Sequence, residues 1–159
     1  MPAAVIEQWK EELGWTEATT SNSEEAATLR TRIEGYEDKG YGACYLRDER
    51  MAAVAQDALK NFDNKRYRLL AWCIMPNHVH VLAEPKPGHL LSDVIHSWKS
   101  FTAHQAKRLL GRTGRFWMPD YFDRFIRSDK HFAAIVDYIR QNPVMAGLVE
   151  TAEAWPWAG

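Results

Sequence analysis

The stretch Tyr67–Pro85, YRLLAWCIMPNHVHVLAEP, decides the fold that the sequence predicts. Two apolar runs rich in β-forming residues, Tyr67–Met75 and Val79–Ala83, flank the turn formers Pro76 and Asn77. Two such runs on either side of a short turn are typical of an antiparallel β-hairpin. The sequence therefore predicts a pair of neighbouring strands in the middle of the chain.

His78 and His80 stand where the second strand of this hairpin begins. Side chains alternate between the two faces of a strand, so residues two apart share a face. We therefore expect both imidazoles on one face, with Val79 and Val81 on the opposite face. Two adjacent imidazoles on a rigid strand can bind one divalent cation. The competing interpretation is a pair of half-buried histidines satisfied by hydrogen bonds.

Length and composition are those of an ordinary globular protein. The chain has 159 residues, 46% of them apolar and 26% charged, which suits one domain with its own core. No apolar run is long enough to cross a bilayer, and the N-terminus has no signal-peptide pattern. Cys44 and Cys73 form no CxxC motif, which suits buried thiols in a reducing compartment. We therefore expect a cytoplasmic protein without a membrane partner.

Charge is distributed unevenly along the chain. Residues 1–63 hold 7 Lys and Arg against 13 Asp and Glu, a net charge of −6. Residues 64–159 hold 13 against 8, a net charge of +5, so the half with the histidine pair is basic. A basic half favours a polyanionic partner, although an ordinary mixed surface explains so modest an excess equally well.

The spacing of apolar residues predicts five helices around the hairpin. They are expected over residues 2–13, 24–34, 49–62, 90–110 and 130–141. The expected N-caps are Ser23, Asp48 and either Ser128 or Asp129. The helix over 24–34 has few apolar positions and is expected at the surface, while Asn142-Pro143 is expected to end the last helix.

Two further segments receive an expectation of their own. Tyr121–Ile126, YFDRFI, is rich in aromatic residues and is expected to form a short strand. The tail Thr151–Gly159 carries two tryptophans and is expected to pack as an irregular cover.

The last predicted helix carries residues of chemical interest. Tyr138 and Asn142 are four residues apart and so lie on one helical face. Tyr138 is a potential nucleophile, and Asn142 offers a carbonyl oxygen to a hard cation. The other interpretation of Tyr138 is a core aromatic. Arg124, Arg127 and Arg140 add positive charge, for which a solvated surface is an equally good explanation.

Together these segments resemble the REP-associated tyrosine transposases, which are single-tyrosine HUH nucleases related to small insertion-sequence transposases. The resemblance rests on MPNHVHVL (Met75–Leu82), WMPDYFDRFIR (Trp117–Arg127) and DYIRQNPVMAGLV (Asp137–Val149). It covers about residues 48–149, and the order and spacing of the three motifs match the family.

The resemblance implies a fold, a site and a reaction. It implies a ferredoxin-like α+β fold whose antiparallel sheet has helices on one face. His78, His80 and Asn142 would be the ligands of Mg²⁺ or Mn²⁺, and Tyr138 would attack single-stranded or REP-like hairpin DNA to form a 5′-phosphotyrosine link. Independently of the resemblance, we expect stacking and phosphate contacts with this DNA from Trp98, Lys99, Arg124, Arg127 and Arg140. For Trp98 a position in the core is at least as good an explanation. The family acts as a monomer or a homodimer, and in a bacterium it would work in the cytoplasm at the nucleoid.

One departure from the family concerns the first strand. The family opens with a strand near the N-terminus, whereas this sequence begins with a helical pattern. Either the chain is a shortened form, or another segment such as Gly40–Leu46 fills the gap. We expect a single domain with a helical segment over 1–47, a nuclease core over 48–149 and a tail over 150–159. The alternatives to the nuclease are a catalytically silent nucleic-acid-binding module and a metal-dependent hydrolase of another phosphodiester.

Overall fold

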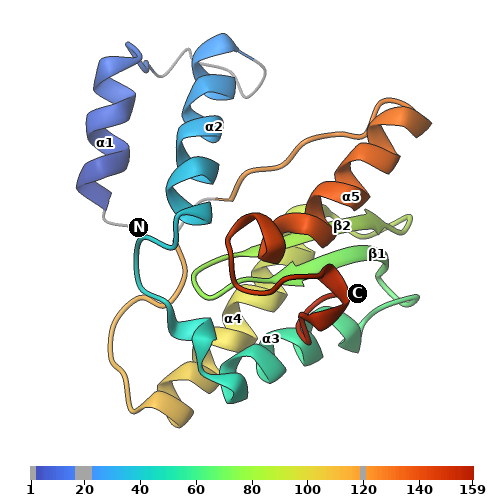
Figure 1. The fold of residues 1–159 in the computed structure, drawn as a ribbon. Coiled ribbons are helices and arrows are strands. Elements are labelled where there is room, and N and C mark those ends of the chain that lie inside the picture. The colour runs from blue at the N-terminus through green and yellow to red at the C-terminus, as the bar shows by residue number, and fades with distance from the viewer. Residues whose placement is uncertain (1–2, 17–22, 119–120) are drawn as a thin grey trace.

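A small antiparallel sheet lies between layers of helices in the computed structural model, which describes residues 3–16, 23–118 and 121–159 (Figure 1). In chain order the elements are α1 (Ala3–Glu12), α2 (Glu24–Asp38), the 3-10 turn η1 (Tyr45–Arg47), α3 (Glu49–Asn61), β1 (Tyr67–Ile74), β2 (Val79–Pro85), α4 (Leu91–Leu110), α5 (Asp129–Met145) and the 3-10 turn η2 (Ala152–Ala154). Pro2, the expected first residue of the first helix, lies outside the described residues. The fold belongs to the predicted α+β class.

The predicted hairpin is confirmed as the antiparallel pair β1–β2. Cys73 faces His80 across the pair, and Ile74 faces Val79. The turn closes with a hydrogen bond of 2.9 Å from the Met75 amide to the His78 carbonyl. This register fixes which residues of β2 share a face with each residue of β1.

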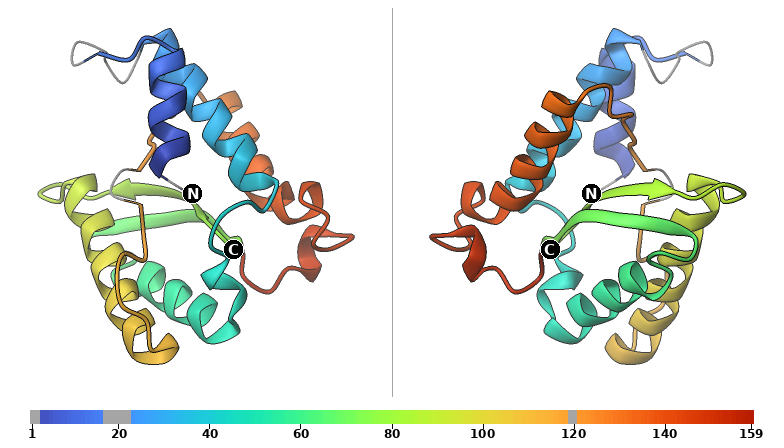
Figure 2. Two further views of the ribbon diagram at one scale, coloured as in Figure 1. Left: turned by 90° about the vertical axis from the view of Figure 1, so that its left-hand side faces the viewer. Right: turned by 90° about the vertical axis from the view of Figure 1, so that its right-hand side faces the viewer.

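The two faces of the hairpin are covered by different helices (Figure 2). On one face, Trp72 and Ile74 of β1 pack with the apolar sides of α3 and α4. On the other face, Ala71 and Cys73 pack with Ile139 of α5. Helices α3 and α4 therefore share one face, whereas α5 covers the opposite face. The helices thus lie on both faces of the hairpin and not on one face as expected, because the apolar side of α5 packs on the second apolar surface of the sheet.

Three helices begin at the N-caps that the sequence predicts. The capping oxygens accept hydrogen bonds from the backbone two or three residues later, at Ser23 (3.2 Å from Ala26 N), Asp48 (3.0 Å from Arg50 N) and Ser128 (3.1 Å from His131 N). Each bond satisfies an amide that has no partner inside its helix, so these short polar side chains fix the helix starts.

Helix α2 departs from its prediction in length and position. It continues to Asp38, and Leu29 and Ile33 are buried on one side of it. The expectation of a surface helix is therefore wrong. Its apolar residues are few, but these two are four apart and so form one compact apolar strip.

Helix α5 also runs further than its prediction, because it passes through Pro143 to Met145. Proline fixes a φ that a helix tolerates, and here it removes one backbone donor near the end of the helix. The Ala146 amide still bonds to the Asn142 carbonyl at 2.9 Å. The chain then leaves the helix at Gly147, whose φ of 68° is left-handed.

The C-terminal tail is more regular than the irregular cover expected of it. The amide and carbonyl of Gly159 bond to the carbonyl and amide of Trp72, at 3.0 and 2.7 Å. The Ile74 amide bonds to the Trp157 carbonyl at 2.8 Å. The tail therefore pairs with the outer edge of β1 and satisfies backbone groups that the hairpin leaves open.

Neither of the other two candidate strands forms. Tyr121–Ile126 has no strand hydrogen bonding, and its Asp123 carbonyl instead accepts a hydrogen bond of 3.2 Å from the Arg30 side chain of α2. Gly40–Leu46 turns into η1, where the Leu46 amide caps the hairpin turn by bonding to the Pro76 carbonyl at 3.0 Å. Among the described residues, the sheet therefore has two strands.

Candidate active site

His78 and His80 point toward each other at the start of β2. Their Nε2 atoms are 2.9 Å apart, and their rings meet edge to face with centroids 4.6 Å apart. Since His80 faces Cys73 across the hairpin, the pair lies on the face that α5 covers. The two-residue spacing thus produces the shared face that the sequence predicts.

Asn77 fixes the ring of His78. Its amide nitrogen donates to the carbonyls of Glu37 and Tyr41, at 2.8 and 2.9 Å. Both donors are then directed at carbonyls, so its Oδ1, which lies 2.8 Å from His78 Nδ1, accepts from that ring nitrogen. The proton of neutral His78 is thereby assigned to Nδ1, and Nε2 keeps a lone pair directed at His80.

Burial keeps His78 neutral. Only 7% of the residue is exposed, and this burial, with a smaller contribution from the charge of His80, lowers the pKa of His78 from 6.5 to about 3. Burial acts in this direction because an imidazolium loses its hydration. A neutral imidazole with a fixed lone pair is the form in which histidine binds a metal.

Tyr138 reaches the histidine pair from α5. Its ring centroid is 5.3 Å from that of His80, at an interplanar angle of 73°. The half-buried ring also packs in the apolar cluster of Ile135 and Ile139. Tyr138 is therefore partly a core aromatic, as the other interpretation of its position predicts. Asn142 is buried one helical turn later. The structure therefore brings the candidate nucleophile of α5 against the histidine pair of β2, two elements far apart in sequence.

The donor set fits a small divalent cation. Two ligands about 2.1 Å from an octahedral ion, at right angles to each other, are about 3.0 Å apart. The separation of the two Nε2 atoms, 2.9 Å, matches such a pair. Within the described residues no three His, Cys, Asp or Glu side chains gather around one point, and the amide of Asn142 remains the expected third ligand.

Of the charged residues expected to contact DNA, the three arginines are exposed, whereas Lys99 is held by a backbone contact. Arg124 and Arg127 are exposed on the segment that leads into α5. Lys99 instead holds that region in place, because its Nζ donates to the Met118 carbonyl at 2.9 Å. Arg140 is exposed but follows Tyr138 by two residues, which turns it to the other side of the helix.

Trp98 belongs to the core. Its Nε1 donates to the hydroxyl of Tyr67 at 2.9 Å, and the two rings meet edge to face at 5.0 Å. The indole is therefore held inside the packing between α4 and β1, and the expected contact with DNA is replaced by this structural role.

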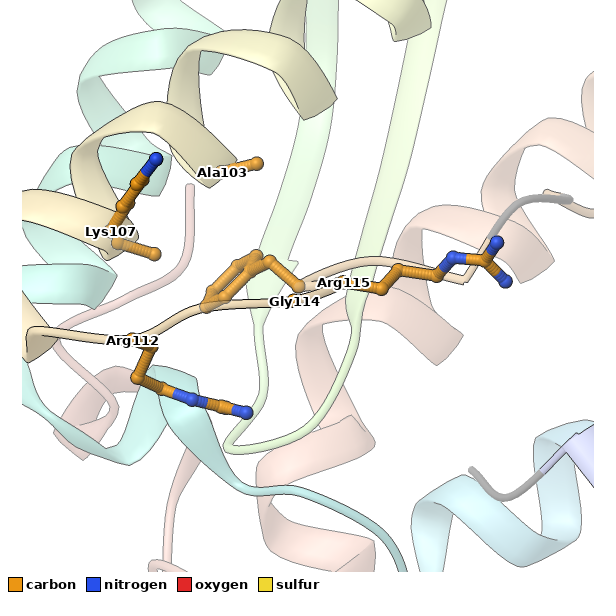
Figure 3. A pocket seen from close by; sticks show the side chains of 7 residues that line it. Ala103, Lys107, Arg112, Gly114 and Arg115 are labelled. Atoms are coloured by element: carbon orange, nitrogen blue, oxygen red, sulfur yellow. The ribbon is translucent and has the colours of Figure 1, made fainter.

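A basic loop follows α4 on the opposite face of the sheet. Lys107, Arg112 and Arg115 line a pocket of about 10 Å³ there. In Figure 3 their charged ends extend in three different directions around Gly114. The Arg112 guanidinium instead stacks 3.7 Å from the ring of Tyr45. The pocket is therefore the size of a water molecule and has no converging cations to hold a larger ligand.

Sequence reasoning missed two features near the site. The sequence predicts Asn77 only as a turn residue. Its position directly before His78 is the one sequence signal for its contact with that ring. The sequence predicts a strand at Tyr121, Phe122 and Phe125, yet all three residues are exposed.

Known proteins share sequence and fold with this chain. Residues 43–142 match the sequence model of a family described as "Transposase IS200 like". The chain is 28% identical over 102 residues to a Haemophilus influenzae protein named "Putative REP-associated tyrosine transposase", and the alignment covers 58% of this chain. It also spans only 58% of that relative.

A solved structure shares the fold. It is titled "Structure of the REP associates tyrosine transposase bound to a REP hairpin", and it matches with a TM-score of 0.60 at 24% identity. The match covers 74% of this chain and 67% of that one. In the described part of the chain, no helix has the length and apolar character needed to cross a membrane. Since the family match takes in well over half of the residues, the chain belongs to the IS200-like transposase family.

Proposed function

We propose that the protein is a metal-dependent endonuclease and strand transferase for single-stranded DNA, with Tyr138 as its nucleophile. One observation carries the proposal. The two Nε2 atoms of His78 and His80 converge at 2.9 Å, and Tyr138 of α5 lies against His80. Simple hydrolysis by a metal-bound water would not need a tyrosine at this position.

In the proposed reaction the Tyr138 hydroxyl oxygen attacks a backbone phosphorus. A bond forms between that oxygen and phosphorus, and the bond from phosphorus to the 3′ oxygen breaks. The phenol proton is lost, and the departing 3′ oxygen gains a proton to become a free hydroxyl. The product is a 5′-phosphotyrosine ester, which conserves the energy of the broken bond, so a 3′-hydroxyl can reverse the step on another strand.

The other residues of the site support this step. His78, His80 and Asn142 would hold Mg²⁺ or Mn²⁺, and the bound ion would neutralise charge on the scissile phosphate. Asn77 keeps the lone pair of His78 Nε2 directed at that position. An unperturbed phenol has a pKa of about 10, so Tyr138 needs a nearby cation to favour its ionised form.

A hairpin of the REP type is the substrate that we propose. The solved relative is bound to a REP hairpin. The basic half of this chain, with a net charge of +5 over residues 64–159, suits such a polyanion. Arg124 and Arg127 provide exposed positive charge on the segment that enters α5.

The test is cleavage of a REP-like hairpin with single-stranded flanks, with Mg²⁺, with Mn²⁺ and with EDTA. We expect cleavage in a flank with either metal and none with EDTA. His78→Ala should cleave poorly and recover partly in excess metal, while His96→Ala on the exposed side of α4 should behave as the parent. Binding without cleavage under all conditions would instead identify a silent nucleic-acid-binding module.

A further inference from the structure

The segment Tyr121–Arg127, YFDRFIR, presents aromatic rings to solvent beside the candidate site. Tyr121 is 40% exposed, Phe122 is 41% exposed and Phe125 is 78% exposed. Three large aromatic side chains so close in sequence would normally be buried, because each loses a large favourable burial free energy when it faces water. Neighbouring exposed aromatics of this kind mark a surface that binds something.

The segment is held in place although it has no regular secondary structure. Arg30 of α2 donates to the Asp123 carbonyl at 3.2 Å, and the ammonium of Lys99 lies 5.7 Å from the centre of the Tyr121 ring. In Figure 1 this segment runs from a position beside α2 to the start of α5. The exposed rings therefore lie on a segment that is anchored to α2 and α4.

The same segment is joined to the candidate active site by packing. Ile126 packs into the apolar cluster that contains Ile135 and Tyr138. Phe125 and Arg127, the neighbours of Ile126, are both exposed. A ligand that extends from Tyr138 past Ile126 would therefore come close to an exposed cation and an exposed aromatic ring.

The alternation of rings and cations matches the chemistry of unpaired nucleic acid. Arg124 lies between Phe122 and Phe125 in the sequence, and Arg127 follows them. Bases without a pairing partner stack on aromatic side chains, and arginines hold the phosphates between them. A duplex hides its base faces, and an apolar protein partner would leave the two arginines without anionic partners.

We propose that Tyr121–Arg127 is a stacking platform for the unpaired nucleotides of the strand that Tyr138 cleaves. Phe122 and Phe125 stack on bases, and Arg124 and Arg127 hold the adjoining phosphates. The inference rests on the proposed function and deepens it, because it names the residues that select a single strand over a duplex and that lead the strand to the nucleophile.

The first experiment measures affinity for a fluorescent single strand by anisotropy. It uses the Tyr138→Phe background, so that no DNA is cleaved. Phe125→Ala should weaken binding about tenfold, as the loss of one stacked base predicts. Phe125→Leu should weaken it nearly as much, because it keeps apolar area but no flat ring. Phe101→Ala, which removes a 47% exposed ring from α4, is the matched control and should bind as the parent.

A second experiment locates the stacked base. Single abasic sites are placed along the strand, and each is measured with the parent and with Phe125→Ala. At the stacked position the base and the ring act together, so Phe125→Ala should have no further effect there. Binding to a blunt duplex of equal length should not change. Phe122→Ala should show the same pattern at a different position.

The proposal is overturned if Phe125→Ala and Phe122→Ala bind single strands as tightly as Phe101→Ala does. It is also overturned if no abasic position removes the effect of Phe125→Ala, since the segment would then serve another partner. Circular dichroism checks that each variant is folded. Adduct formation by the parent chain is measured separately, so a chain that forms the adduct but has no stacking position contradicts this inference alone.

Discussion

Asn77 and His78 are joined by a contact of 2.8 Å between Asn77 Oδ1 and His78 Nδ1, and this contact sets the orientation of the imidazole. The amide of Asn77 is itself fixed by the carbonyls of Glu37 and Tyr41. Both carbonyls lie just before residues 43–142, which match the family. The end of α2 and the turn after it therefore support the proposed metal ligand from outside the matched region.

Asn77→Ala should lower metal-dependent cleavage about 10- to 100-fold, as is usual when a partner that orients a metal-binding histidine is lost. The variant should need more Mn²⁺ than the parent for half-maximal cleavage, because His78 is then free to turn. The measurement is cleavage over a metal titration, with Asn61→Ala at the exposed end of α3 as the control. Identical titrations for the two variants would contradict the orienting role of Asn77.

The burial of His78 predicts a loss of stability in acid for the metal-free protein. Its folded pKa of about 3 lies below the unfolded value of 6.5, so the unfolded state takes up the proton first as the pH falls. The contribution of this group is therefore retained above pH 6.5 and lost progressively toward pH 3. Between pH 7 and pH 5, the free energy of unfolding should fall by about 2 kcal/mol through this residue.

Urea denaturation at the two pH values, in EDTA, checks this prediction. His78→Gln removes the titrating group, so its stability should fall by about 2 kcal/mol less than that of the parent. His89→Gln changes an exposed histidine and should follow the parent. An equal fall for His78→Gln and the parent would show that His78 is not held neutral in the folded state.

The hairpin, the helix starts and the shared face of the histidines were predictable because their signals are local. A turn former between two apolar runs, a short polar residue before a helix and an i, i+2 spacing each involve a few adjacent residues. Ser23, Asp48 and Ser128 cap their helices for this reason.

The features that the sequence did not predict depend on partners far away in the chain. Tyr121–Ile126 resembles a strand, but it forms no ladder with either strand of the hairpin, and its Asp123 carbonyl accepts from Arg30, which lies 93 residues earlier. Likewise, no local pattern indicates that the carbonyls of residues 37 and 41 will hold Asn77. Pro143 is a local signal that misled, because α5 continues to Met145 although the proline removes one backbone donor.

The two cysteines should differ sharply in reactivity. Cys73 is fully buried, and this burial raises the pKa of its thiol to about 12. The thiolate is the form that reacts, so Cys73 should resist iodoacetamide at pH 8, whereas the partly exposed Cys44 should be alkylated. Mass spectrometry of the native protein measures both sites. Alkylation of Cys73 at the rate of Cys44 would contradict the packing of α5 on β1.

The measurement that tests the central claim most directly is the location of the covalent DNA adduct. The parent chain is incubated with Mn²⁺ and a 3′-labelled REP-like strand, digested with trypsin and analysed by mass spectrometry. Tyr138 is the single tyrosine of the tryptic peptide His131–Arg140, and Tyr121 falls in a different peptide. We predict a nucleotide adduct on His131–Arg140, its loss in Tyr138→Phe and its persistence in Tyr121→Phe. An adduct on the peptide of Tyr121, or one that survives in Tyr138→Phe, would contradict the account.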